Sequence, residues 1–175
     1  MFDPTVYDNL KVVLEGGIYD LDLAGRILVT DRSDLVDLSV MSRDFRLRFI
    51  LRDSIAEPAQ AHVRLSANLA NLAAEILEQK GSDPGCNLSI RFRTRIVNPD
   101  QECHVLGEGI RQIWGKGITM TQQISYLFGD ESPQYLNNIQ ISFDHVITET
   151  HIDDIPSLLN HIVKTLRFLD HTALS

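Results

Sequence analysis

The sequence predicts an α+β fold, a two-layer sandwich whose mostly antiparallel sheet (a four-strand meander plus N-terminal strands) is packed by two amphipathic helices. Several segments alternate apolar and polar residues, as half-buried strands do. Two longer segments repeat apolar residues every three or four positions, as amphipathic helices do. Strands followed by a helix recur in both halves of the chain. The 175 residues suffice for one core, and we expect a single domain over 1–175.

The first helix is predicted over residues 57–80. Leu65, Leu69, Leu72 and Ile76 are spaced by four, three and four residues, which places them on one stripe. Pro58 suits a first helical turn.

The second helix is predicted from Asp153 or Asp154 to near the C-terminus, because either aspartate can cap the free amides of a first turn. Apolar residues recur at helical spacing behind these caps. They are Ile155, Leu158, Leu159, Ile162, Leu166 and Leu169.

A four-strand meander is predicted between the two helices. Residues 87–97 alternate strictly, and the sequence Asn98-Pro99-Asp100 reads as a turn. Residues 104–114 and 118–128 flank Gly115-Lys116-Gly117, which suits a hairpin loop. The last strand is predicted over residues 139–147.

Short strands are predicted ahead of the first helix. The apolar segments 11–14, 18–23, 26–30 and 35–40 are separated by turn residues that include Gly16, Gly17 and Gly25. Residues 45–51 alternate most clearly, with Phe45 and Leu47 on one side and Arg46 and Arg48 on the other.

Composition limits the classes of partner. The chain has 24 acidic and 16 basic residues, for a formal charge of −8, which opposes attraction to nucleic acid or anionic lipid. Residues 1–5 lack the features of a signal peptide, and no run of about 18 apolar residues occurs, so we expect a cytoplasmic protein with no membrane or nucleic-acid partner. The two cysteines, Cys86 and Cys103, are expected as free thiols, and no metal or cofactor is predicted.

Two sets of alternating arginines are the most unusual feature: Arg46, Arg48 and Arg52 in one predicted strand, and Arg91, Arg93 and Arg95 in another. Guanidinium groups spaced by two residues form a row of forked donors suited to a carboxylate, a phosphate or a coenzyme tail. Alternatively, these arginines form a solvated face that pairs with acids on neighbouring strands. The acids considered for such pairing are Asp20, Asp22, Asp34 and Asp37.

The candidate catalytic residues are His62, Asn71 and Glu75 on the predicted first helix. Asn71 and Glu75 are four residues apart and would lie on adjoining turns, where an amide and a carboxylate can orient water. The alternative interpretation is a hydrated helix face.

The predicted order of a long helix followed by four antiparallel strands, over residues 57–147, resembles the hot-dog fold of acyl-thioester enzymes. The resemblance is one of element order, with no motif. It implies a pocket between the first helix and the sheet.

Two hypotheses of function follow. The first is a non-enzymatic module, a homo-oligomer or a protein-interaction module that uses sheet faces or edges, with Trp114, Tyr126 and Tyr135 as exposed aromatic residues. The alternative is a hot-dog-like protein that binds a small ligand or processes an acyl thioester. Because no catalytic signature occurs, we favour the first.

Overall fold

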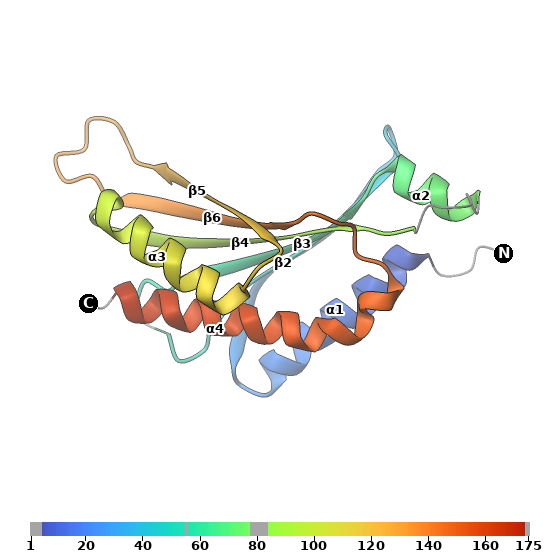
Figure 1. Cartoon of the computed structure of the whole chain (residues 1–175), viewed down its shortest axis with the longest axis horizontal. Coiled ribbons are helices and arrows are strands. Elements are labelled where there is room, and N and C mark those ends of the chain that lie inside the picture. Colours follow the sequence, from blue (N-terminus) through green and yellow to red (C-terminus); the bar gives the residue numbers. More distant parts are fainter. Residues whose placement is uncertain (1–4, 55, 78–83, 174–175) are drawn as a thin grey trace.

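The computed structural model describes residues 5–54, 56–77 and 84–173. Within them, six strands form one open antiparallel sheet, and helices α1, α3 and α4 lie on one of its faces (Figure 1). The bounds in chain order are α1 Val6–Leu23, β1 Ile27–Asp37, β2 Ser42–Leu51, β3 Gln60–Ala67, α2 Leu69–Ile76, β4 Asn87–Ile96, α3 Pro99–Trp114, β5 Ile118–Ser125, β6 Tyr135–Phe143, the 3₁₀ helix η1 Glu149–Asp154 and α4 Ile155–Ala173. The predicted α+β class is confirmed.

The strand order is β1-β2-β3-β4-β6-β5, and every neighbouring pair is antiparallel. Strands β1 to β4 follow one another in sequence and in space, so the meander lies here and not over residues 87–147 as predicted. Helix α3 carries the chain from β4 to the far edge, where β5 forms, and β6 then returns between β4 and β5. Strands β1 and β5 are therefore the two edges.

The core fills the space between the sheet and the three helices. The inward face of the sheet contributes large buried side chains such as Phe45, Phe49 and Phe92, which alternate with outward polar residues. Leu10 of α1 and Leu166 of α4 are among the helix residues buried against them. Burial of this kind stabilises the fold by about 25 cal/mol per Å² of apolar surface.

The predictions for β2, β4 and the closing helix are confirmed in position and type. Residues 45–51 lie in β2, residues 87–96 form β4, and α4 begins directly after Asp154. The prediction of strand 139–147 is shifted, because β6 begins at Tyr135 and ends at Phe143.

The predicted helix over 57–80 is wrong for its first half. Residues Gln60–Ala67 form β3, in which Ala61, Val63 and Leu65 are buried and the residues between them face outward. Asn68 then caps the short helix α2 through a reciprocal capping box with Asn71. The leucine spacing that suggested one long helix therefore joins a strand residue to residues of α2. Residues 78–80 lie outside the described residues.

The predicted strand over 104–114 is also wrong, because these residues belong to α3. Asn98 caps this helix and Pro99 occupies its first turn, so the expected turn is a helix start. Gly109 suits this helix because a Cβ atom there would lie 2.1 Å from Cζ of Phe168 on α4. The glycine allows the two helices to approach closely.

The predicted strands over 11–14 and 18–23 are replaced by α1. Leu10, Leu14 and Ile18 recur every four residues and are buried on one stripe. Gly17, which suggested a turn, lies where a Cβ atom would be 2.7 Å from Leu159 of α4. The predicted segments 26–30 and 35–40 contribute to one longer strand, β1, with a bulge between Val29 and Asp31.

These corrections remove the element order on which the resemblance to the hot-dog fold rests. A strand, the eight-residue helix α2, another strand and helix α3 occupy the positions of the long helix and the first two strands. None of the residues of α2 is fully buried, so this helix does not cover the sheet as the resemblance implies.

Candidate functional site: the open face of the sheet

Within the described residues, the face of the sheet opposite α1, α3 and α4 is left open (Figure 1). We call this surface the open face. Its side chains come from the outward positions of β1, β2, β3, β4 and β6. They include Asp31, Ser33, Asp44, Arg46, Arg48, His62, Arg64, Ser89, Arg91, Arg93, Arg95, Asn138 and Gln140.

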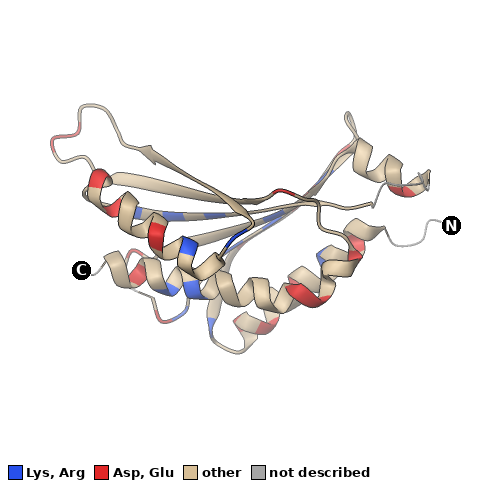
Figure 2. Cartoon of the chain, in the orientation of Figure 1, with Lys and Arg blue, Asp and Glu red and all other residues tan. Residues whose placement is uncertain are grey.

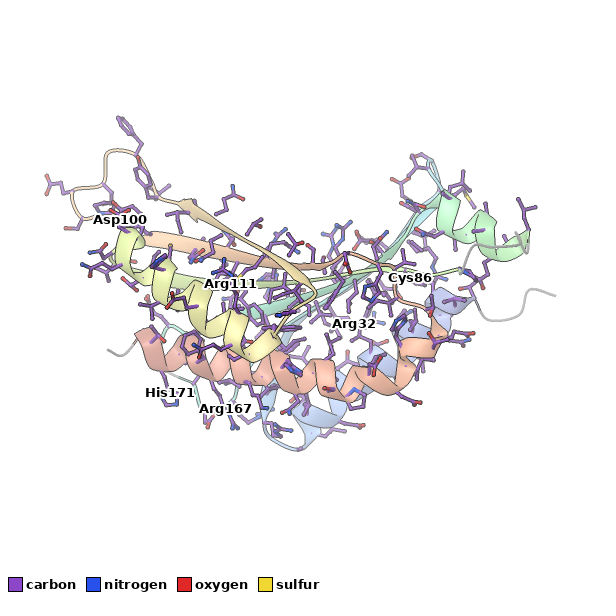
Figure 3. All side chains as sticks on the ribbon, viewed as in Figure 1. Arg32, Cys86, Asp100, Arg111, Arg167 and His171 are labelled. Carbon is purple, nitrogen blue, oxygen red and sulfur yellow. The ribbon has the colours of Figure 1, made fainter. Side chains whose placement is uncertain are left out.

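The open face is basic although the chain is acidic. The six arginines of this set are opposed by four acids, namely Asp31, Asp44, Asp37 at a further outward position of β1, and Glu57 beside Arg95, which leaves a formal charge of +2 in a chain whose formal charge is −8. Figure 2 shows basic residues, in blue, along the central strands and most of the acidic residues, in red, along the helices. The arginines labelled in Figure 3 are not part of the open face. Arg111 lies on α3, Arg167 lies on α4, and Arg32 donates a hydrogen bond to Glu15 of α1.

Strand register arranges these side chains in two rows that cross the sheet. The first, which we call the His62 row, runs through Asp31, Arg48, His62, Arg91 and Gln140, each directly opposite the next. The second, the Arg64 row, runs through Ser33, Arg46, Arg64, Ser89 and Ser142. Like charges directly opposite each other destabilise a sheet, so Arg46 opposite Arg64 needs a compensating anion.

Asp44 supplies that anion. Its carboxylate accepts a hydrogen bond of 2.7 Å from Nε of Arg46 and one of 2.8 Å from Nε of Arg64. Burial would raise the pKa of Asp44, but the hydrogen bonds and charges of the two arginines outweigh it and lower the pKa to about 2. One carboxylate thus serves two guanidinium groups.

The arginines of the His62 row and Arg93 are less well compensated, whereas Arg95 pairs with Glu57 at 3.3 Å. Arg48 pairs with Asp31 at 3.3 Å, and Nε of Arg91 donates to the neutral Oε1 of Gln140 at 3.1 Å. Arg93 has neither a hydrogen bond nor an ion pair within the described part of the chain. Positive charge therefore remains unpaired on the open face.

His62 lies at the centre of this charge. Its Nε2 atom is shielded from solvent and has no hydrogen-bond partner within the described residues, and the same holds for Nε of Arg48. Burial first, and then the charges of Arg48, Arg91 and Arg93, lower the pKa of His62 to about 4. At neutral pH its imidazole is therefore uncharged.

The two rows enclose a hollow of about 570 Å³. Its size falls within the range of about 300–1,000 Å³ that is usual for ligand sites. We use "the hollow" for this cavity. It is lined by Asp31, Ser33, Arg46, Leu47, Arg48, His62, Val63, Arg64, Ser89, Arg91 and Gln140.

Exposed apolar side chains project at both ends of the sheet. At one end, the turn between β1 and β2 exposes Leu38, 77% of whose surface is accessible, and α2 exposes Ile76 nearby. At the opposite end, the β5–β6 loop exposes Leu127 and Phe128, the latter 98% accessible. Both ends rise on the side of the open face (Figure 1). We call these two groups, Leu38 with Ile76 and Leu127 with Phe128, the apolar tips.

The predicted binding residues converge, whereas the candidate catalytic residues do not. Arg46, Arg48, Arg91, Arg93 and Arg95 lie on one face, with β3 between the two sets. By contrast, the candidates of the predicted helix lie on different elements. His62 is on β3, Asn71 lies in the first turn of α2 and accepts the backbone N–H of Asn68, and Oε1 of Glu75 accepts the backbone N–H of Val6 at 2.8 Å.

Sequence reasoning missed Arg64 and misplaced the acids. Arg64 falls within the predicted helix over 57–80, although the alternation of residues 61–67 is the signal that places it opposite Arg46. Of the acids expected to pair with the arginines, Asp22 does pair with Arg52 of the first set at 2.6 Å, although from α1 and not from a neighbouring strand, whereas Asp34 pairs with Lys11. Of the expected aromatic residues, Tyr126 is exposed, but Trp114 packs inward and donates to Thr165 at 2.9 Å.

Comparisons with family models, with curated proteins and with solved structures gave no match to this chain. The described helices include none that is long and apolar enough to cross a membrane. Three or more potential metal ligands are nowhere grouped within the part of the chain that the structure describes. Both cysteines are free thiols, as the sequence predicts.

Proposed function

We propose that this chain is a non-enzymatic binding protein whose open face takes an acidic segment of a protein partner. The observation that carries the proposal is the positive charge of the open face in a chain that is acidic overall. Complementary charge attracts a partner and selects its orientation. An acidic segment would supply the carboxylates that Arg91 and Arg93 lack.

The apolar tips favour an extended peptide segment as the ligand of the open face over a small ligand alone. Strand β4 has ten residues, which correspond to a length of about 33 Å at 3.3 Å per residue. An extended segment of similar length reaches from one end of the sheet to the other. Apolar residues at its ends would cover Leu38 and Phe128, whose exposure to water is otherwise unfavourable.

The positions of the candidate catalytic residues favour binding without catalysis. Glu75 and Asn71 are occupied in structural hydrogen bonds at α2, and His62 lies on the open face of β3. A general base must lie within hydrogen-bond reach of the group that it activates. The three residues therefore do not form one catalytic set.

A labelled peptide tests the proposal. The probe is a glutamate-rich peptide of about ten residues with leucine at each end, matched to the length of β4. We expect it to bind, and a lysine-rich peptide of the same length not to bind. Raising the ionic strength from about 0.01 M to 0.15 M should weaken binding, because the Debye length falls from about 30 Å to 8 Å.

Two double variants with the same change of charge locate the surface. Arg91→Gln with Arg93→Gln removes charge from the open face, and we expect about tenfold weaker binding, equivalent to about 1.4 kcal/mol. Arg111→Gln with Arg167→Gln removes the same charge from α3 and α4 and should leave affinity unchanged (Figure 3). Equal losses in the two double variants, or no binding of the acidic peptide, would refute the proposal.

A further inference from the structure

We propose that the hollow is a subsite for a dianionic phosphoryl group, carried either by a phosphorylated residue of the bound segment or by a free phosphate. In its first form the inference rests on the proposed function, whereas in its second form it stands alone. The hollow is the part of the open face where guanidinium groups from three neighbouring strands, β2, β3 and β4, surround one cavity.

The charge of the hollow matches a dianion. Four arginines line it, Arg46, Arg48, Arg64 and Arg91. The two carboxylates that pair with them, Asp31 and Asp44, leave a formal charge of +2. A phosphorylated side chain carries a charge of about −1.5 to −2 at neutral pH, whereas a single carboxylate carries −1. The phosphoryl group therefore neutralises the hollow more completely.

The geometry of the His62 row suits a tetrahedral oxyanion. Arg48 and Arg91 flank His62 on the two neighbouring strands, so their backbones lie about 10 Å apart at a spacing of about 4.8 Å per strand. Guanidinium groups on long side chains span that gap from both sides. Their forked donors form paired hydrogen bonds with phosphate oxygens.

The bonding state of these side chains leaves donors available. Arg91 uses Nε for the neutral amide of Gln140, and no carboxylate within the described residues pairs with its guanidinium group. Nε of Arg48 and Nε2 of His62 have no partner there either. Polar atoms shielded from solvent are usually satisfied, so a group that engages this row would remove an unfavourable feature of the unbound protein.

The arrangement is unfavourable for stability alone. Cross-strand neighbours stabilise a sheet when their charges are opposite, yet Arg46 opposes Arg64 with one shared carboxylate, that of Asp44, and Arg48 and Arg91 flank a His62 that cannot be protonated without opposing them. A row of hydroxyl or amide side chains would hold the same strands at lower electrostatic cost. A bound dianion would offset this electrostatic cost.

Titrations with three probes test the subsite: inorganic phosphate, the acidic peptide of the previous section, and the same peptide with one phosphoserine at its centre. We expect phosphate to bind, and phosphorylation to tighten peptide binding by about tenfold, the effect of one charge-assisted contact of about 1.4 kcal/mol.

Three variants that keep their charge, two in the hollow and one control, locate the subsite. Arg91→Lys retains the charge but loses the fork, so the gain from phosphorylation should disappear while the unphosphorylated peptide still binds. Arg93→Lys is the matched control, because Arg93 lies on the same strand outside the lining of the hollow. Arg48→Lys provides a second test within the hollow, and thermal unfolding checks that each variant is folded.

The outcomes separate the two proposals. If the acidic peptide binds but neither phosphate nor phosphorylation has an effect, the subsite is refuted and the proposed function stands. If phosphate binds and Arg91→Lys abolishes this binding, while the acidic peptide does not bind, the subsite stands in its free-phosphate form and the proposed function is refuted. Equal loss of the phosphorylation gain in Arg91→Lys and Arg93→Lys would also refute the subsite.

Discussion

Arg46 and Arg64 lie directly opposite each other on neighbouring strands and share one carboxylate, that of Asp44. The three side chains form a compact charged group on the open face in which positive charge is in excess. Because Asp44 lies two residues before Arg46 on the same strand, both point to the same side of the sheet. This relationship fixes two of the four guanidinium groups of the hollow in position.

Replacing Asp44 should destabilise the fold. Asp44→Asn leaves two arginines opposite each other without their anion, and hydrogen bonds to a charged group contribute about 1.5–3 kcal/mol each before solvent exposure is considered. Since both arginines are about half exposed, we expect a loss of about 1–2 kcal/mol in urea denaturation.

The pH dependence of this effect has a defined sign. The pKa of Asp44 is lowered to about 2 in the folded protein, so its contribution is present above the ordinary carboxyl pKa and is lost as the pH falls toward 2. The difference in stability between wild type and Asp44→Asn should shrink between pH 4 and pH 2. A difference that stays constant over that range would contradict the assignment.

His62 should make the protein less stable in mild acid. Its pKa is lowered to about 4 in the folded protein, from an ordinary value near 6.5, so the unfolded chain binds the proton more readily. Stability due to the neutral imidazole is present above pH 6.5 and is lost as the pH falls to 4. In denaturation curves recorded across this window, His62→Gln should flatten that decline, and His104→Gln, on the exposed surface of α3, should not.

Sulfate should reverse part of the His62 effect. This ion remains a dianion over the same pH window, and in the hollow it would oppose the charges of Arg48 and Arg91 that help to lower the pKa of His62. We therefore expect the pKa of His62, followed by NMR of the imidazole, to rise when sulfate is added. At a pH below the pKa of His62 both with and without sulfate, sulfate should bind tenfold more tightly than at neutral pH for each unit by which it raises this pKa. An unchanged titration at saturating sulfate would count against binding in the hollow.

A methyl group at Gly109 should disrupt the contact between α3 and α4. A Cβ atom there would lie 2.1 Å from Cζ of Phe168, and overpacking of this kind costs about 1–3 kcal/mol. The matched control is Gly16→Ala on α1, where nothing lies within 4 Å of the added atom. Because alanine favours helix over glycine, that control should be stabilised by up to about 1 kcal/mol. Thermal unfolding distinguishes the two variants.

The bond between Trp114 and Thr165 can be tested in the same region. Nε1 of Trp114 donates to the buried hydroxyl of Thr165 at 2.9 Å, so Thr165→Val leaves the indole N–H without its acceptor, at a cost of about 1–3 kcal/mol. Thr172→Val is the control, because that hydroxyl bonds only to the carbonyl of Phe168, one turn earlier in α4. Urea denaturation followed by the fluorescence of Trp114, the single tryptophan, measures both. Similar losses in the two variants would argue against the indole bond.

The sequence was informative where only one periodicity fits. Strand β4 alternates without exception and α4 repeats apolar residues at helical spacing, so both were predicted correctly, although Asp153 and Asp154, the expected caps, lie in η1. In 60–77, by contrast, two periodicities overlap: Leu65 belongs both to the alternation of β3 and to a leucine spacing that continues into α2. The long-range pairing of β3 with β2 and β4 decides between them.

Glycines explain most of the other errors. Gly16 and Gly17 suggested a turn, and Gly107 and Gly109 lie in the predicted strand over 104–114, yet all four are inside helices. At Gly17 and Gly109 the reason is contact with α4, a partner more than fifty residues away in the chain. The arginine sets were recognised from alternation alone, whereas the sharing of Asp44 and the central position of His62 depend on strand order.

The return of β6 between β4 and β5 also has a consequence for the growing chain on the ribosome. Strands β1 to β4 pair with neighbours in sequence and can assemble as successive hairpins. The outer edge of β4 gains its partner only after residues 135–143 have been synthesised. Until then this edge presents unpaired backbone groups beside apolar residues, such as Ile90 and Phe92, that are buried in the folded protein. Unpaired edges and exposed apolar residues together favour aggregation of nascent chains. Late synthesis of β6 therefore delays completion of the sheet until most of the chain has been made.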